Sequence, residues 1–305
     1  MNKIINKALF YKEWINVRWV TLLTIIVLLF YKVYGVISLL NENKFTMERS
    51  GYTTTRWFNN GLYMKQDSYF NGFYIQQDSY FFIMIFVVII LAIILFIGEK
   101  TSETQGLIAS MPFTRKEIIL NKWFVGVLSI LISFVVAYTF LSLFYFANIS
   151  GLDPVLNPYS DIIKWFFMDT FQYICIFTFM VLMQTVMGNS IVSGIVGGII
   201  PILPYFIIRV IRILITAHYG FLQCVVMVCN KIESCLNIYS YNLPYQNWVK
   251  TEPNASWFSY TNYNLKLLVL LILTCLFLYL SYVFYKKKRL EYNLRLLSFK
   301  KKFKG

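Results

Sequence analysis

Long apolar segments alternate with short polar ones along the whole chain. Five segments are almost entirely apolar: Trp19–Leu40, Tyr80–Ile97, Trp123–Phe146, Ile163–Met187 and Leu265–Tyr285. At about 1.5 Å of rise per residue, a helix of any of these lengths covers the roughly 30 Å hydrocarbon core of a bilayer. A sixth segment begins at Ile191, and Pro201 and Pro204 predict a kink within it. The pattern predicts an all-α integral membrane protein with six transmembrane helices.

Composition supports the membrane assignment. The 305 residues are 58% hydrophobic and 19% aromatic, and only 14% are charged, whereas soluble domains average about 25% charged residues. Residues 1–18 have mixed charges and no A-x-A cleavage site follows them, so we expect the first span to remain as an anchor. We expect one transmembrane domain over residues 1–305.

The distribution of charge predicts the topology. The net charge is +14, and the basic residues concentrate in residues 1–18 and 286–305, whereas the loops 41–79 and 219–264 hold equal numbers of acids and bases. By the positive-inside rule both termini are cytoplasmic, so the number of spans is even. We therefore interpret Ile211–Cys235 as a re-entrant or interfacial element on the outer side rather than as a seventh span.

The predicted layout follows from these boundaries. Residues 1–18 form a cytoplasmic amphipathic helix, and 286–305 form a basic cytoplasmic tail. In that tail, leucines between lysine clusters suit a helix lying on anionic lipid rather than one binding nucleic acid. The spans are expected at about 19–40, 80–98, 123–146, 163–187, 191–212 and 265–285 of a multi-pass protein of the plasma membrane.

The polar segment Gly98–Trp123 carries helix-capping signals. Ser102 with Gln105, and Thr114 with Glu117, have the spacing of the capping box, in which each side chain bonds to a backbone N–H at the start of a helix. Phe113 and Ile118 flank the second box as a hydrophobic staple. Pro112 disfavours helix at the residue before it. The segment is therefore predicted to form a rigid corner of two helices.

The first of these helices, near 103–110, is short and apolar on one side. Leu107, Ile108 and Met111 share that side, beside Gly106. Such a helix suits insertion into a groove on a cytoplasmic partner. An interfacial loop that dips into the lipid headgroups is an equally good interpretation of the residues alone.

The same segment resembles a known family. The pattern of an acid, a glycine, a P-x-[ST]-R corner and a lysine is similar to the segment between the second and third spans of type-2 ATP-binding-cassette (ABC) permeases. Those positions are filled here by Glu99, Gly106, Pro112, Thr114, Arg115 and Lys122. The resemblance extends to the layout of the chain, with "YKEW" in an amphipathic N-terminal helix and a re-entrant segment between spans five and six.

The resemblance implies a function for the corner. In that family the short helix is the coupling helix, which docks on a separate ATPase subunit. Carried over, Gly106–Met111 would form the contact, and Arg115 and Lys122 would secure the corner. ATP and Mg would then be bound in the partner subunit and no cofactor by this chain. A second copy of the permease or a sister permease is expected to complete the transporter.

Motifs of catalysis are missing from the sequence. There is no G-x-x-x-x-G-K-[ST] for phosphate binding, no H-E-x-x-H and no G-x-S-x-G. The single histidine, His218, has no partner at metal-ligand spacing. We expect neither an enzyme nor a metal site.

Four ionisable residues fall in or near predicted spans. They are Lys32, Asp169, Arg209 and Arg212. A charge at the centre of a bilayer costs about 2.5–3.5 kcal/mol, so each requires a partner, a cavity or an interface. Asp169 and the two arginines are predicted at the same outer level, where a pair would hold an outer gate shut. Alternatively, the arginines reach the outer headgroups and Asp169 faces interfacial water. Lys32 is expected either to snorkel or to face the bundle.

Two further features leave alternatives open. "YMKQDSYF" from Tyr63 and "YIQQDSYF" from Tyr74 form a near duplication, either a ligand-facing aromatic cluster or a tolerated repeat in a loop. Cys224, Cys229 and Cys235 lie on the predicted outer side, and their disulfide state is not readable from spacing.

Three functions are compatible with these features. The first is an ABC permease, an exporter of an antimicrobial peptide, a lipid or a drug-like amphiphile. The second is a membrane-bound immunity or binding protein that captures a peptide with its outer loops without ATP. The third is an ion-coupled transporter, which Asp169 favours and the lack of inverted repeats disfavours.

Overall fold

The computed structural model describes residues 7–38, 68–70, 73–75, 79–100, 113–149, 158–219, 224, 227–229, 232, 238–241, 245–248 and 256–287. Six helices in these ranges are long and apolar enough to cross a membrane, as the hydropathy pattern predicted. They are Lys7–Ser38, Tyr80–Gly98, Arg115–Ala147, Ser160–Val186, Ser190–His218 and Tyr263–Lys287.

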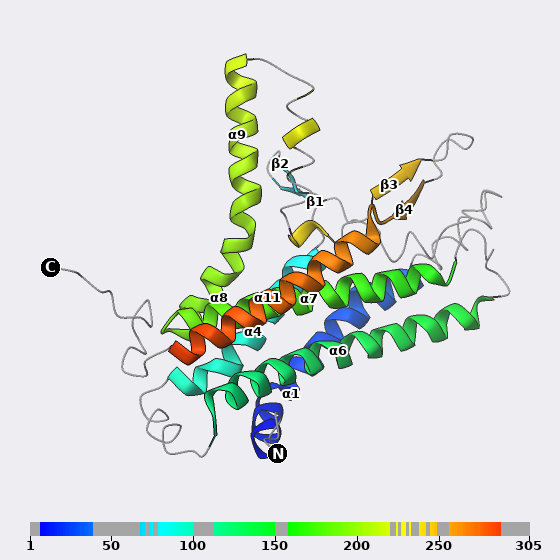
Figure 1. The fold of residues 1–305 in the computed structure, drawn as a ribbon. Helices are drawn as coiled ribbons and strands as arrows, with labels where there is room; N and C mark the ends of the chain where they lie inside the picture. Colours follow the sequence, from blue (N-terminus) through cyan, green and yellow to red (C-terminus); the bar gives the residue numbers. More distant parts are fainter. Residues whose placement is uncertain are drawn as a thin grey trace.

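One helix forms the centre of the bundle (Figure 1). Helix α7 (Ser160–Val186) packs against α4 (Ser79–Lys100), α6 (Arg115–Ala147), α8 (Ser190–Ile199) and α11 (Tyr263–Lys287). The most apolar part of α7 is 78% buried by protein, whereas that of α11 is 11% buried. Most of the α11 surface therefore faces outward from the bundle. In a membrane protein, this surface faces lipid.

The N-terminal helix differs from its predicted form. We expected a separate amphipathic helix over residues 1–18, but α1 (Lys7–Leu28) continues through the π-helical turn η1 (Leu29–Val33) and on to Ser38. Leu9, Glu13, Val17 and Val20 recur every three or four residues and are all buried. This stripe is the face of α1 that packs against α6 and α4, so α1 belongs to the bundle from its first described turns.

The fifth candidate span is broken at its prolines. Helix α8 ends at Ile199, a 3-10 turn η3 (Ile200–Ile202) contains Pro201, and α9 (Leu203–Tyr219) follows. Figure 1 shows α9 leaving the bundle instead of continuing along it, and its main packing partner is η3. The predicted kink is confirmed. The outer element predicted to begin at Ile211 is, as far as Tyr219, a continuation of α9.

Two short hairpins make the protein less purely helical than predicted. Strand β1 (Ser68–Phe70) pairs antiparallel with β2 (Phe73–Ile75), and β3 (Tyr245–Trp248) pairs with β4 (Ser256–Ser259). The first hairpin lies within the near duplication and pairs Tyr69 with Tyr74. In the second copy, the residue that corresponds to Tyr69 is Tyr80, which lies in α4. The two copies therefore fold differently.

Close helix contacts depend on glycine. At Gly126 of α6, a Cβ atom would lie 2.0 Å from Cζ of Phe177 on α7. At Gly198 of α8, it would lie 2.9 Å from Cδ1 of Ile89 on α4. Small residues let membrane helices approach closely enough for their side chains to interlock. These two positions set the spacing of α6 and α8 from the rest of the bundle.

Candidate functional site

The start of α6 is fixed by a complete capping box. The Glu117 backbone N–H donates to Thr114 Oγ1 at 3.3 Å, and the Thr114 N–H donates to Glu117 Oε2 at 2.9 Å. The structure thus confirms the box predicted from the Thr114 and Glu117 spacing. Phe113 and Ile118, the predicted staple residues, both pack into the hydrophobic core. Helix α6 therefore begins at a defined residue immediately after the corner.

Lys122 joins α6 to two other helices. Its Nζ lies 3.0 Å from Oε1 of Glu13 on α1, and the two side chains are only 3% and 4% exposed. The same Nζ donates to the backbone carbonyl of Leu95 on α4 and lies 5.2 Å from the centroid of the Phe96 ring. An ammonium group has three N–H donors, so one lysine can serve both acceptors while it stays out of solvent.

A fourth helix reaches the same region through Arg115. Its Nη1 donates to the backbone carbonyl of Lys286, near the end of α11, at 3.0 Å. Asn121 Nδ2 donates to the carbonyl of Glu117 and so reinforces the first turns of α6. We call Glu13, Leu95, Thr114, Arg115, Glu117, Lys122 and Lys286 the corner junction. It ties the ends of α1, α4, α6 and α11 together.

In the sequence, the segment predicted to form the coupling helix falls between Leu95 and Thr114, two residues of this junction. Helix α4 ends at Lys100 and α6 begins at Arg115, so residues 101–114 connect the two. Residues 101–112, with Gly106, Leu107, Ile108, Met111 and Pro112, lie outside the described residues, as does the capping box predicted at Ser102. Glu99 belongs to the last turn of α4. The role of these residues stays a prediction.

Sequence reasoning missed three residues of the junction. Leu95 and Lys286 take part through their backbone carbonyls, and Glu13 takes part through its side chain. In the sequence, Glu13 is one of the mixed charges of residues 1–18. It is nonetheless the only acid in residues 1–41. Lys122 lies at the predicted start of a membrane helix, and a lysine that is buried there needs a partner. This requirement could have identified Glu13 from the sequence.

A second buried cluster contains two of the intramembrane charges. Tyr80 Oη donates to Oδ2 of Asp169 at 3.1 Å, and Lys32 Nζ lies 4.4 Å from the centroid of the Tyr80 ring. The exposed fractions of Lys32 and Asp169 are 9% and 2%. We call these three residues the charged cluster. Lys32 therefore faces the bundle, one of the two alternatives left open, and the cluster joins η1, α4 and α7.

The predicted partners of Asp169 lie on another element. Arg209 and Arg212 are half-buried residues of α9, the helix that leaves the bundle (Figure 1). Asp169 is a buried residue of α7 and accepts a hydrogen bond from Tyr80, a partner that sequence reasoning did not name. The pair between Asp169 and either arginine stays a prediction.

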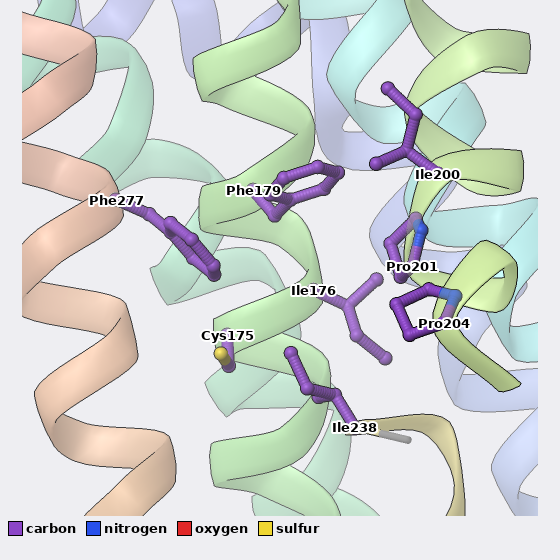
Figure 2. A pocket seen from close by; sticks show the side chains of 8 residues that line it. All are labelled: Cys175, Ile176, Phe179, Ile200, Pro201, Pro204, Ile238 and Phe277. Atoms are coloured by element: carbon purple, nitrogen blue, oxygen red, sulfur yellow. The ribbon is translucent and has the colours of Figure 1, made fainter. Parts of the chain in front are cut away.

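A small apolar cavity lies where α8 turns into α9. Figure 2 shows Pro201 and Pro204 on one side of it, Cys175, Ile176 and Phe179 of α7 on another, and Phe277 of α11 opposite. Its volume is about 140 Å³. The lining side chains offer no charge or hydroxyl group, so the cavity suits an apolar group.

Neither a metal cluster nor a disulfide occurs in the part of the chain that the structure describes. No group of three or more His, Cys, Asp or Glu side chains is close enough there to hold a metal ion. The described cysteines, Cys175, Cys224, Cys229 and Cys275, are free thiols. Cys235 lies outside the described ranges.

Comparison with known proteins identifies the family. A family model described as ABC-2 family transporter protein matches residues 8–290, which is most of the chain. A search of curated proteins gave no match. Members of this family are membrane subunits without an ATPase domain and work with an ABC ATPase subunit. The bundle of apolar helices and the match over nearly its whole length lead to one conclusion: the chain belongs to the ABC-2 family and is the permease subunit of an ABC transporter.

Proposed function

We propose that this permease is an exporter whose corner segment, residues 101–112, receives movement from the ATPase partner. The observation that carries the proposal is the contact of Lys122 with both Glu13 and Leu95. Movement of the segment would pull on the end of α4 and the start of α6, and Lys122 holds both of these to α1. The corner junction therefore supports transmission of force into the bundle.

Within the segment, the apolar residues would make the contact with the ATPase. Leu107, Ile108 and Met111 would enter a groove on the ATPase, Gly106 would allow close approach, and Pro112 would end the helix. Glu99, at the end of α4, would flank the contact. Thr114, Arg115, Glu117 and Lys122 would then hold the other side of the corner rigid through the bonds described above.

The proposed cargo is amphiphilic: a peptide, a lipid or a drug-like molecule. Two observations support this class. The chain is 19% aromatic, and the cavity at the turn between α8 and α9 is lined by apolar side chains. Large apolar side chains with few polar groups bind apolar ligand surfaces well. We further propose that the permease works as a pair with itself or a sister permease, in the plasma membrane, with both termini cytoplasmic.

Co-purification with a candidate ABC ATPase tests the proposal. Ile108→Asp places a charge on the proposed contact, and we expect loss of the ATPase from the complex. Ile149→Asp is the matched control, since Ile149 is exposed beyond the far end of α6. If Ile108→Asp retains the ATPase and full transport, the proposed contact is wrong. If cells resist a toxic peptide equally well with and without the ATPase, the immunity or binding function replaces export.

A further inference from the structure

An apolar groove runs between α6, α7 and α11. It encloses a cavity of about 360 Å³ whose walls include Trp123, Leu131, Phe167, Phe171, Leu271 and Cys275. Leu131, Phe167, Leu271 and Cys275 are all exposed, so the cavity is open to the outside of the bundle. Every lining residue lies in a candidate span, so the medium at its mouth is the hydrocarbon of the bilayer.

The walls of the groove are held in place. Trp123 Nε1 donates to Thr178 Oγ1 at 2.9 Å, which fixes the indole ring between α6 and α7. Phe167 and Phe171 stack with ring centroids 6.3 Å apart. Helix α11 packs mainly along α7 and less along α6, which leaves the groove between α6 and α11. A groove with fixed aromatic walls binds a chain at a lower entropic cost than a mobile surface does.

Cations gather at one end of the groove. Arg115 and Lys116 at the start of α6, and Lys286 and Lys287 at the end of α11, are exposed. The bond from Arg115 Nη1 to the Lys286 carbonyl brings these two helix ends together. The acid in this stretch, Glu117, is engaged with the Thr114 N–H. The end of the groove therefore presents four positive charges on two adjacent helices, against the one negative charge of Glu117.

The spacing between the cations and the cavity matches a lipid chain. Trp123 lies eight positions after Arg115, and Lys286 lies eight positions after Leu278, another lining residue. At about 1.5 Å per residue, each distance is roughly 12 Å along the helix. One leaflet contributes about 15 Å of hydrocarbon, half of the bilayer core. An acyl chain whose headgroup lies at the cations therefore reaches the cavity.

We propose that this groove is a binding site for an anionic phospholipid. One acyl chain fills the cavity between α6, α7 and α11, and the phosphate lies on Arg115, Lys116, Lys286 and Lys287. The four cations favour a lipid with net negative charge over a zwitterionic one. The lipid is a bound component of the permease rather than its cargo, and the site does not depend on the direction of transport.

Native mass spectrometry of the purified permease tests the site. Phosphatidylglycerol and phosphatidylcholine with identical chains are titrated in detergent, and bound lipid is counted. Phosphatidylglycerol is expected to bind more tightly. Replacing Lys286 and Lys287 by Gln is expected to weaken its binding on the order of 30-fold, at about one kcal/mol for each cation, and to leave phosphatidylcholine unchanged. Replacing Lys7 and Lys12, exposed lysines of α1, by Gln is the matched control.

A second pair of variants tests the chain-binding part. Leu131→Trp fills the groove and is expected to weaken both lipids, whereas Leu143→Trp, on the same helix but outside the groove, is expected to weaken neither. Equal affinity of the unmodified permease for the two lipids, or equal effects of the two Trp variants, would overturn the proposal.

A measurement without variants covers the case in which Leu131→Trp fails to fold. Phosphatidylglycerol is expected to slow the reaction of Cys275 with N-ethylmaleimide, as read by peptide mass spectrometry. Cys224, which is exposed and outside the groove, is the internal control. If lipid leaves Cys275 unprotected, the proposal is wrong. If Cys275 is shielded without lipid and only in dimeric permease, the groove is an interface between two copies instead.

Discussion

Lys122 Nζ lies 3.0 Å from Glu13 Oε1, so two residues 109 positions apart in the sequence form a buried ion pair at the corner of an ABC-2 permease. The pair links the first described turns of α1 to α6, and the bond to the Leu95 carbonyl adds α4. An unpaired charge in such a buried site is costly. Variants of this pair therefore allow its contribution to stability and its contribution to coupling with the ATPase to be measured separately.

Removing one partner of this pair is expected to destabilise the permease strongly. In Lys122→Met, Glu13 keeps its charge in an apolar site, and the expected loss is about 3–5 kcal/mol of unfolding free energy. The double variant Lys122→Met with Glu13→Met is expected to recover most of it. Denaturant unfolding in detergent measures both. Lys164→Met, at the more exposed 3.8 Å pair with Asp161, is the control and should change stability little.

The same double variant tests coupling. If the permease folds without the pair but the ATPase no longer drives transport, the contact transmits movement. Full transport by a stable double variant would limit the pair to a structural role.

The capping box is expected to stabilise the first turn of α6 specifically. Thr114→Ala removes the side-chain acceptor for the Glu117 N–H, at a cost of about 1 kcal/mol. Hydrogen exchange of the amides of Lys116 and Glu117 should rise, while the middle of α6 stays protected. Thr139→Ala, on the same helix with an exposed hydroxyl bonded to Val136, is the matched control. Equal exchange in the two variants would show that the box adds nothing.

The charged cluster predicts that Tyr80 is energetically coupled to Asp169. Tyr80→Phe removes the hydrogen bond to a buried carboxyl group, and the expected cost is about 1.5–3 kcal/mol. Tyr279→Phe, on the exposed face of α11, should be neutral. A double-mutant cycle with Asp169→Asn is expected to give a larger coupling energy for Tyr80 than for Arg209 or Arg212. A larger value for either arginine would favour the outer gate predicted from the sequence.

We expect the contact of α6 with α7 not to tolerate an added methyl group at Gly126. Gly126→Ala would place Cβ 2.0 Å from Phe177 Cζ, so we expect a loss of about 1–3 kcal/mol from overpacking. Phe177→Leu, combined with it, should restore part of that loss. Gly98→Ala is the control, because no atom beyond its chain neighbours and its own helix backbone lies within 4 Å of the added Cβ, and alanine favours the helix. If Gly126→Ala is as stable as Gly98→Ala, Phe177 moves without cost.

Local and periodic signals were sufficient for much of the fold. The apolar runs predicted six candidate spans, the three-residue spacing of Thr114 and Glu117 predicted a box that the structure contains, and Pro201 predicted the break between α8 and α9. Each of these depends on residues close together in the sequence. The continuity of α1 past residue 18 was missed because the charges of that segment suggested an interface, whereas its buried stripe packs on α6.

Long-range contacts could not be derived in the same way. The pairing of Lys122 with Glu13 and of Asp169 with Tyr80 depends on which helices are neighbours, and periodicity does not supply that information. The near duplication shows a further limit. Tyr69 and Tyr80 occupy corresponding positions in two similar octapeptides, but one lies in a hairpin and the other in a helix. Residues outside the repeat therefore determine whether this tyrosine position lies in a strand or in a helix.

The Lys122 contact also restricts how α6 can move. Sliding α6 along its axis by one turn, about 5.4 Å, would separate the ammonium group from Glu13 and leave two charges in an apolar interior. Tilting α6 about Lys122 keeps the ion pair while the far end of the 33-residue helix swings. Helix α6, the third candidate span, is therefore suited to tilt about Lys122 and not to slide along its own axis.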